Sequence, residues 1–269
     1  MPPIVRVGGK HYMIKHLLKM IPSHVFYVEV FGGAGHLLFA KEPSKVEVYN
    51  DLDSAVYTFY KVVRERKEEL LEKLDWTLYS REEFEYDRKH IYDEEIDDVE
   101  KARRFFVSNA LNPLLFTCSI GNKTELGSTA VTFRNKIEML DAVRERLKYV
   151  TIENKDFRFI LKTYDRPETF FYLDPPYVIN TRLSKGKMYK HEMTEFDHGE
   201  LVDILLSIKG KVLLSGYDNE IYSRLEENGW HTRTFTVNNV IGNKFSDVKK
   251  VDKVIEKVWY NYELGLFDI

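Results

Sequence analysis

The chain has 269 residues, 43% of them hydrophobic, which suffices for a sizeable α/β domain with its own core plus an inserted module. Its single cysteine, Cys118, excludes a disulfide framework and a cysteine metal site, and no metal is expected. No signal-peptide pattern opens the chain and no apolar run approaches a membrane span, so we expect a cytoplasmic protein without a membrane partner. The net charge of -3 is not the strongly basic balance of a dedicated nucleic-acid binder, so basic residues have to be judged locally.

The amino-terminal part of the chain predicts a helix, two strands and a glycine-rich turn between the strands. Residues 11–21 carry apolar side chains at helical spacing, and residues 25–31 and 45–49 are typical of strands. The turn Phe31-Gly32-Gly33-Ala34-Gly35 is expected to open a short helix over 36–41. Glycines there permit a tight turn and let a ligand lie against the backbone, beside the N–H groups that begin the helix.

A carboxylate, Asp51, follows the second predicted strand. In that position it can accept hydrogen bonds from both hydroxyl groups of a ribose. The glycine turn and Asp51 together favour a nucleotide-like ligand. They do not separate a dehydrogenase from a methyltransferase, because both use this geometry.

Residues 54–149 are mainly helical in pattern and contain no convincing strand alternation. The α/β rhythm resumes after them, with strands expected at 150–153, 169–173, 211–215, 232–237 and 251–260. Helices are expected at 196–209, where residues 194–197 have the spacing of a capping box, and at 219–228. The last two strands have no helix between them and should pair antiparallel. The pattern therefore predicts an α/β fold with a mixed, mostly parallel sheet.

The tetrapeptide Asp174-Pro175-Pro176-Tyr177 is the most informative stretch of the chain. It follows the apolar strand 169–173, so it should lie at the carboxyl end of a buried strand, where open α/β sheets bind ligands. The Asp174 carboxylate and the Pro175 carbonyl can accept hydrogen bonds from an exocyclic amine and free its lone pair for attack. Proline holds that carbonyl at a fixed φ, and Tyr177 offers a ring face to a planar base. The alternative is an ordinary turn, since Asp and Pro are common turn formers.

Several blocks in a fixed order resemble one family. They are Gly8-Gly9-Lys10, Phe31 to Gly35, Asn50-Asp51-Leu52-Asp53, Asn154-Lys155-Asp156-Phe157, the Asp174 to Tyr177 tetrapeptide, residues 189–201 and Leu214-Ser215-Gly216-Tyr217-Asp218. In these blocks the chain resembles the Dam-type (D12 class) N6-adenine-specific DNA methyltransferases, particularly their phage and mobile-element branch. The blocks span nearly the whole chain.

The resemblance implies a class I S-adenosylmethionine-dependent methyltransferase fold, Rossmann-like, with residues 1–53 and 150–269 as the catalytic domain. Residues 54–149 would form the helical target-recognition domain. The reaction would be direct methyl transfer from S-adenosylmethionine to N6 of an adenine flipped out of double-stranded DNA. The residues implied in catalysis are Asp174, Pro175, Pro176 and Tyr177.

The resemblance also implies a set of cofactor-binding residues. Asp156 would bind the amino group of the cofactor's adenine and Phe157 its ring, although Asp156 also suits a helix N-cap. Arg6 stands where the family usually has an aromatic residue, so the chain departs from the family's pattern at this position. The full set is Gly8, Gly9, Lys10, Phe31, Gly32, Gly33, Ala34, Gly35, Asp51, Asp156, Phe157 and Asp174.

Double-stranded DNA is the partner that the resemblance implies, and a cognate restriction endonuclease is a further candidate partner; nothing in the sequence indicates the oligomeric state. Arg103 and Arg104 are interpreted either as groove readers or as solvated helix residues. The candidate DNA-binding residues are polar or basic and lie in the insertion or after the tetrapeptide. They are Asn122, Lys123, Arg134, Asn135, Lys136, Lys185, Lys187, Tyr189 and His191.

Three alternatives stay open on the sequence. An N4-cytosine DNA methyltransferase uses the same chemistry, but that group usually begins the tetrapeptide with Ser. Protein-glutamine and RNA methyltransferases usually begin it with Asn. A catalytically silent DNA-binding subunit with the same fold is disfavoured because the cofactor and tetrapeptide blocks are intact.

Overall fold

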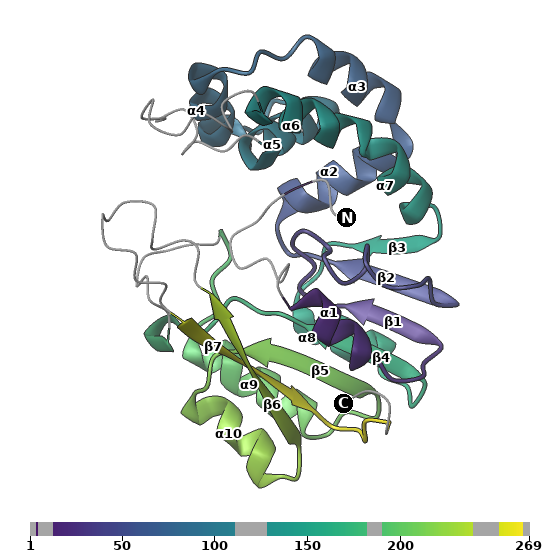
Figure 1. Cartoon of the computed structure of the whole chain (residues 1–269), viewed down its shortest axis with the longest axis vertical. Helices are drawn as coiled ribbons and strands as arrows, with labels where there is room; N and C mark the ends of the chain where they lie inside the picture. The colour runs from purple at the N-terminus through teal and green to yellow at the C-terminus, as the bar shows by residue number, and fades with distance from the viewer. Residues whose placement is uncertain (1–3, 5–12, 111–127, 182–189, 239–252, 266–269) are drawn as a thin grey trace.

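The computed structural model describes residues 4, 13–110, 128–181, 190–238 and 253–265. Its centre is a seven-stranded sheet in the order β3-β2-β1-β4-β5-β7-β6 (Figure 1). The strands are β1 (Phe26–Glu29), β2 (Val46–Asn50), β3 (Val150–Glu153), β4 (Thr169–Leu173), β5 (Lys211–Gly216), β6 (His231–Asn238) and β7 (Lys253–Tyr260).

The direction of the strands confirms the predicted mixed sheet. Neighbouring strands from β3 to β5 pair parallel, and β7 runs antiparallel to both β5 and β6. Strand order reverses at β1, which lies between β2 and β4. Ligands of open α/β sheets bind at such a reversal, outside the carboxyl ends of the strands.

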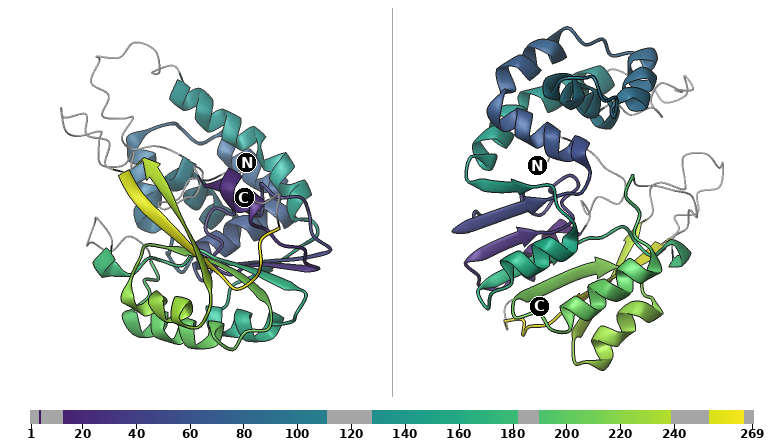
Figure 2. Two further views of the ribbon diagram at one scale, coloured as in Figure 1. Left: turned by 60° about the horizontal axis from the view of Figure 1, so that its bottom comes forward. Right: turned by 180° about the vertical axis from the view of Figure 1, so that it is seen from behind.

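Side chains alternate between the two faces of the sheet, so each buried strand contributes to two cores. Tyr27 and Phe170 belong to one core and Val28 and Phe171 to the other. The first face packs against helices on one side, and the second against helices on the other side (Figure 2). The first set is α1 (Ile14–Lys19), α2 (Ser54–Glu65) and α7 (Leu140–Leu147); the second is α8 (Phe157–Tyr164), α9 (Glu195–Leu205) and α10 (Glu220–Glu227).

The remaining helices form a lobe beyond the β3 edge of the sheet (Figure 1). They are α3 (Lys67–Asp75), α4 (Arg81–His90), α5 (Asp98–Ala110) and α6 (Ser128–Glu138). Phe59 of α2 packs on Phe105 and Phe106 of α5, with ring centroids 5.5 and 5.9 Å apart. The core of this lobe is therefore continuous with that of the sheet. Within the described parts of 54–149 the regular elements are all helical, as the sequence pattern predicts.

The predicted helix over residues 36–41 is wrong: the structure has a series of turns there. The Leu38 N–H donates to the buried Glu29 carboxylate at 3.0 Å, and the Ala40 N–H bonds the Leu37 carbonyl, three residues back, so the α-helical pattern does not continue. The predicted capping box is confirmed, because Thr194 and Asp197 exchange both of its hydrogen bonds at the start of α9. In the part of the chain that the structure describes, no helix has the length and apolarity needed to cross a bilayer.

Candidate active site

The glycine turn after β1 needs its glycines. A Cβ atom on Gly32 would come within 2.2 Å of the Tyr49 ring, so a side chain does not fit there. Gly33 and Gly35 have φ of 54° and 69°, in the left-handed region that other residues rarely adopt. The Tyr49 hydroxyl donates to the Gly33 carbonyl at 2.6 Å, which fixes the turn to β2.

The Asp51 carboxylate lies against this turn, as the sequence predicts. One oxygen accepts from the Gly33 N–H at 2.7 Å and the other from the Asp53 N–H at 2.8 Å. The side chain is only partly buried. Two backbone donors thus orient a partly exposed carboxylate at the carboxyl end of β2.

Two asparagines join the ends of the first three strands. The Asn50 amide donates to the carbonyls of Val30 and Lys155, at 2.8 and 3.0 Å, and accepts from the Lys155 N–H at 2.9 Å. Asn154 donates to the Asp51 carbonyl at 2.7 Å. Sequence reasoning placed both asparagines in matching blocks but assigned them no role. The signal was their position, since each stands at or just after the end of one of two neighbouring strands.

The predicted adenine-binding pair, Asp156 and Phe157, opens α8. Asp156 is the N-cap, since its carboxylate accepts from the Arg158 N–H at 2.9 Å. Phe157 is 5% exposed, and its ring centroid lies 5.8 Å from that of Phe31 in the glycine turn. The N-cap interpretation of Asp156 is confirmed, and contact of either residue with a cofactor stays a prediction.

The tetrapeptide follows β4 and lies beside β5 and β7. The Ser215 hydroxyl of β5 donates to Asp174 Oδ1 at 3.0 Å. The Tyr177 hydroxyl donates to Glu256 Oε2 of β7 at 2.6 Å. The Tyr177 ring meets Tyr217 edge to face, with centroids 4.5 Å apart. Asp174 lies at the carboxyl end of β4, as predicted, and β4 pairs with β1, the strand that precedes the glycine turn.

Sequence reasoning missed three of these contacts. Ser215 and Tyr217 lie in a block quoted for the family resemblance, which was the available signal. Glu256 has none, because it is 79 residues from Tyr177 and only the antiparallel β7 brings it close.

Comparison with known proteins decides the family. Residues 7–239 match the model of the D12 class N6 adenine-specific DNA methyltransferases. The chain belongs to this family. The methyltransferase is also similar to the Type II methyltransferase M1.LlaDCHI of Lactococcus lactis subsp. cremoris, with 26% identity over 268 residues, covering 92% of each chain. The predicted methylation of DNA at adenine N6 is thereby confirmed, in preference to N4-cytosine methylation or a silent subunit.

A buried carboxyl group lies beneath the glycine turn of the methyltransferase. Glu29 accepts from the Tyr27 hydroxyl at 2.7 Å and from the Leu38 N–H. Burial raises the pKa of Glu29 to about 8, against the lowering effect of those two hydrogen bonds. The Asp174 charge raises it further. The negative charge of Asp174 therefore adds to the effect of burial, and both favour the neutral form of Glu29.

The predicted DNA-binding residues of the methyltransferase divide into three groups. Arg134 contacts the end of α3 through Asp75, and the Lys136 amine donates to the Ala110 carbonyl at 3.1 Å. Asn135 and His191 are exposed. The others, with three cofactor candidates and Arg6, lie outside the described residues: Arg6, Gly8, Gly9, Lys10, Asn122, Lys123, Lys185, Lys187 and Tyr189.

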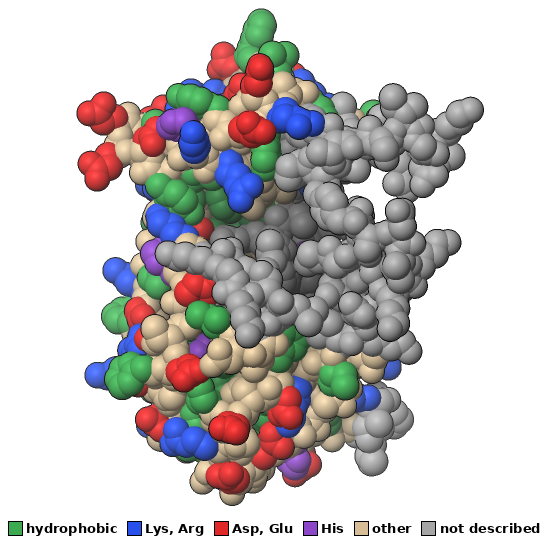
Figure 3. All heavy atoms as spheres, turned by 90° about the vertical axis from the view of Figure 1, so that its left-hand side faces the viewer, with side chains coloured by type: hydrophobic (Ala, Val, Ile, Leu, Met, Phe, Trp, Pro, Cys, Tyr) green, Lys and Arg blue, Asp and Glu red, His purple; other side chains and the backbone are tan. Residues whose placement is uncertain are grey.

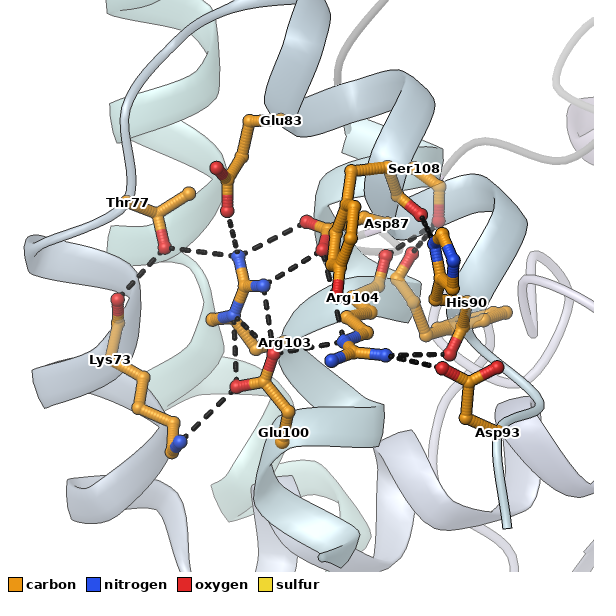
Figure 4. A network of polar contacts seen from close by, with 12 residues as sticks. Lys73, Thr77, Glu83, Asp87, His90, Asp93, Glu100, Arg103, Arg104 and Ser108 are labelled. Carbon is orange, nitrogen blue, oxygen red and sulfur yellow. Dashed lines mark hydrogen bonds and ion pairs between the residues drawn. The ribbon is translucent and has the colours of Figure 1, made fainter. Parts of the chain in front are cut away.

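The structure contradicts both interpretations of Arg103 and Arg104 made from the sequence, as groove readers and as solvated helix residues. Each is 8% exposed, so neither is solvated nor presented to a DNA groove. Arg103 makes a bidentate ion pair with Asp87, with N–O distances of 2.8 and 3.0 Å. It also pairs with Glu83 and Glu100 (Figure 4). Arg104 pairs with Glu100 and donates to the His90 carbonyl. We call these two arginines and their carboxylate partners the arginine cluster; it ties α4 to α5.

The parallel strands point toward one side of the molecule, and the described surface on that side carries both acidic and basic side chains. Figure 3 shows acidic and basic side chains interspersed over the described surface on this side, on the helical lobe as well as around the sheet. This distribution agrees with the net charge of -3. On the described part of this side, basic residues are therefore mixed with acidic ones and do not form one continuous patch.

Proposed function

We propose that the methyltransferase takes its methyl group from S-adenosylmethionine and delivers it to an adenine rotated out of double-stranded DNA. One observation carries the proposal: the glycine turn, Asp51 and Asp174 lie at the carboxyl ends of three adjacent strands, β1, β2 and β4. A backbone cradle, a carboxylate for sugar hydroxyls and an acceptor for an amine therefore share one edge of the sheet.

The residues on the cofactor side fit S-adenosylmethionine. Among the described residues nothing lies within 4 Å of where a Cβ atom of Gly33 would be, so the turn leaves room against its backbone. The Asp51 carboxylate suits ribose hydroxyls, and Phe31 of the glycine turn forms an aromatic pair with Phe157 at the start of α8. We assign these residues, with Gly8, Gly9, Lys10 and Asp156, to the cofactor. When bound, the cofactor supplies a methyl group activated by its sulfonium.

The residues on the adenine side act on the attacking nitrogen. The Asp174 carboxylate and the Pro175 carbonyl accept hydrogen bonds from the N6 amine, which draws its lone pair out of conjugation with the ring. As the new C–N bond forms and the C–S bond breaks, the nitrogen becomes positive, and the negative Asp174 stabilises that charge. One proton then leaves the nitrogen for solvent. Tyr177 holds the base, whose extrusion from the duplex costs a few kcal/mol.

The helical residues 54–149 are proposed as the part that reads the DNA sequence, with Asn122, Lys123, Arg134, Asn135 and Lys136 as candidate contacts. Lys185, Lys187, Tyr189 and His191, after the tetrapeptide, are assigned to the DNA near the flipped base. We place the enzyme in the cytoplasm. The similarity to a Type II methyltransferase supports the proposal that the enzyme acts together with a cognate restriction endonuclease.

The test is to incubate the protein with S-adenosylmethionine labelled in its methyl group and unmethylated genomic DNA, and then identify the labelled nucleoside. We expect N6-methyladenine. Label in N4-methylcytosine, or no labelled nucleoside, would reject the proposal. Single-stranded DNA of the same sequence serves as the control for the duplex requirement.

A further inference from the structure

We propose that Ser215 and Glu256 are positioning residues that orient the two ends of the tetrapeptide, Ser215 acting on the Asp174 carboxylate and Glu256 on the Tyr177 ring. The inference rests on the proposed roles of Asp174 and Tyr177. Neither positioning residue is on β4 or in the loop that carries the tetrapeptide. They belong to β5 and β7, the next two strands of the sheet.

Ser215 fixes the direction of the Asp174 carboxylate. It is fully buried, and its hydroxyl lies 3.0 Å from Asp174 Oδ1 and 3.3 Å from the Leu173 carbonyl. A hydroxyl has one hydrogen, and the charged, nearer oxygen is the stronger acceptor. Holding Oδ1 stops rotation of the carboxylate about its Cβ–Cγ bond. The direction in which Oδ2 faces the amine is therefore set from β5.

Glu256 fixes the plane of the Tyr177 ring. Glu256 is 9% exposed, and its carboxylate accepts from the Tyr177 hydroxyl at 2.6 Å. The Tyr217 ring supports Tyr177 from another direction, at an interplanar angle of 69°. One contact at the hydroxyl and one at the ring leave Tyr177 little freedom to turn. A base stacked on Tyr177 then meets a face whose orientation is already set, so less ordering is required on binding.

The first experiment measures Ser215→Ala. We expect kcat to fall by about 10- to 100-fold, the effect of losing one hydrogen bond to a charged group. The affinity for S-adenosylmethionine and the melting midpoint should stay at the wild-type values, because the change removes one oxygen and leaves the fold. Ser215→Thr keeps the hydroxyl and should recover part of the loss. The matched control is Ser207→Ala, which changes an exposed serine just after α9.

The second experiment is a double-mutant cycle of Tyr177→Phe and Glu256→Ala. Each single variant should raise the KM for DNA by about 10-fold. The KM of the double variant should not exceed that of the more impaired single variant, because both changes remove the same contact. Glu256→Gln keeps an acceptor and should lie close to wild type. Glu227→Gln, an exposed glutamate on α10, is the matched control.

The outcomes separate this inference from the proposed function. Asp174→Ala is assayed in parallel: if it retains turnover, the role of Asp174 itself fails. If Asp174→Ala is inactive while Ser215→Ala has wild-type kcat, only the inference on Ser215 is overturned. A Ser215→Ala loss matched by equal losses of cofactor affinity and melting midpoint would also overturn it, since that is a structural effect. Additive effects in the cycle would overturn the role of Glu256.

Discussion

The arginine cluster of the helical lobe and the carboxyl edge of the sheet both contain buried or half-buried carboxylates, but the two regions hold them differently. In the cluster, Asp87 and Glu100 are neutralised by Arg103 and Arg104. At the sheet edge, Glu29, Asp51 and Asp174 accept from backbone N–H groups and hydroxyl groups. The first arrangement ties helices together, and the second sets the direction of carboxylate oxygens.

The difference predicts that the two regions fail in different ways. Removing a carboxylate from the cluster leaves a buried guanidinium short of a partner, which costs stability. Removing Asp174 from the sheet edge leaves the Ser215 hydroxyl, which still has the Leu173 carbonyl as an acceptor at 3.3 Å, so the fold persists while the chemistry is lost. The following variants test this contrast, from the largest effect to the smallest.

Asp174→Ala should reduce turnover to below about 1% of wild type, because the acceptor for the N6 amine is gone. Cofactor affinity should remain measurable and the melting midpoint should change little. Turnover is measured as N6-methyladenine formed in DNA, and stability by thermal unfolding in the same buffer. A variant that unfolds at much lower temperature would contradict the contrast drawn between the two regions.

Asp87→Ala should destabilise the protein by about 3–5 kcal/mol, the usual cost of removing one partner from a buried ion pair. Asp87 is fully buried, and Arg103 contacts it with two nitrogen atoms. Denaturant unfolding measures the loss, with Glu85→Ala, an exposed site on the same helix, as control. Turnover per folded molecule should stay near wild type; a specific loss of turnover would show that the cluster also serves the site.

Glu29→Gln should change how stability depends on pH. The pKa of Glu29 is about 8 in the folded protein, above the ordinary glutamate value of 4.5, so between these values the folded state binds more protons than the unfolded state. The free energy of unfolding of wild type therefore falls as pH rises through this window, by at most a few kcal/mol. Gln has no such titration and should flatten the dependence. Urea unfolding at pH 5, 7 and 9 measures it, and equal slopes for both proteins would contradict the prediction.

Arg224→Ala should have the smallest effect, within about 1 kcal/mol, because its ion pair with Asp203 is on the surface. This pair joins α10 to α9 in the same way that the arginine cluster joins α5 to α4, but in water. Denaturant unfolding at low and high salt measures it. A loss as large as that of Asp87→Ala would show that burial does not explain the difference between the two regions.

Patterns within one segment were sufficient for most of the fold and for the centre of the site. The apolar run 169–173, predicted as a strand, forms β4. The Asp51 carboxylate, predicted to act with the glycine turn, accepts from the Gly33 N–H in that turn. Contacts between distant segments were not predictable, because no local pattern encodes them. Arg103 and Arg104 look solvated in a charged helical sequence, and their partner Asp87 is on another helix. Over 36–41 the structure has turns in place of the predicted helix, because the Ala40 N–H bonds the Leu37 carbonyl three residues back and the α-helical pattern stops.

The strand nearest the end of the described chain, β7, lies inside the sheet, between β5 and β6. Its antiparallel direction brings its early residues, Glu256 among them, to the end where β5 finishes. During synthesis on the ribosome, Asp174 and the glycine turn are made well before Glu256, which binds the Tyr177 hydroxyl. We therefore expect a nascent chain that ends before β7 not to methylate DNA, because its sheet lacks the strand between β5 and β6 and Tyr177 lacks the Glu256 carboxylate.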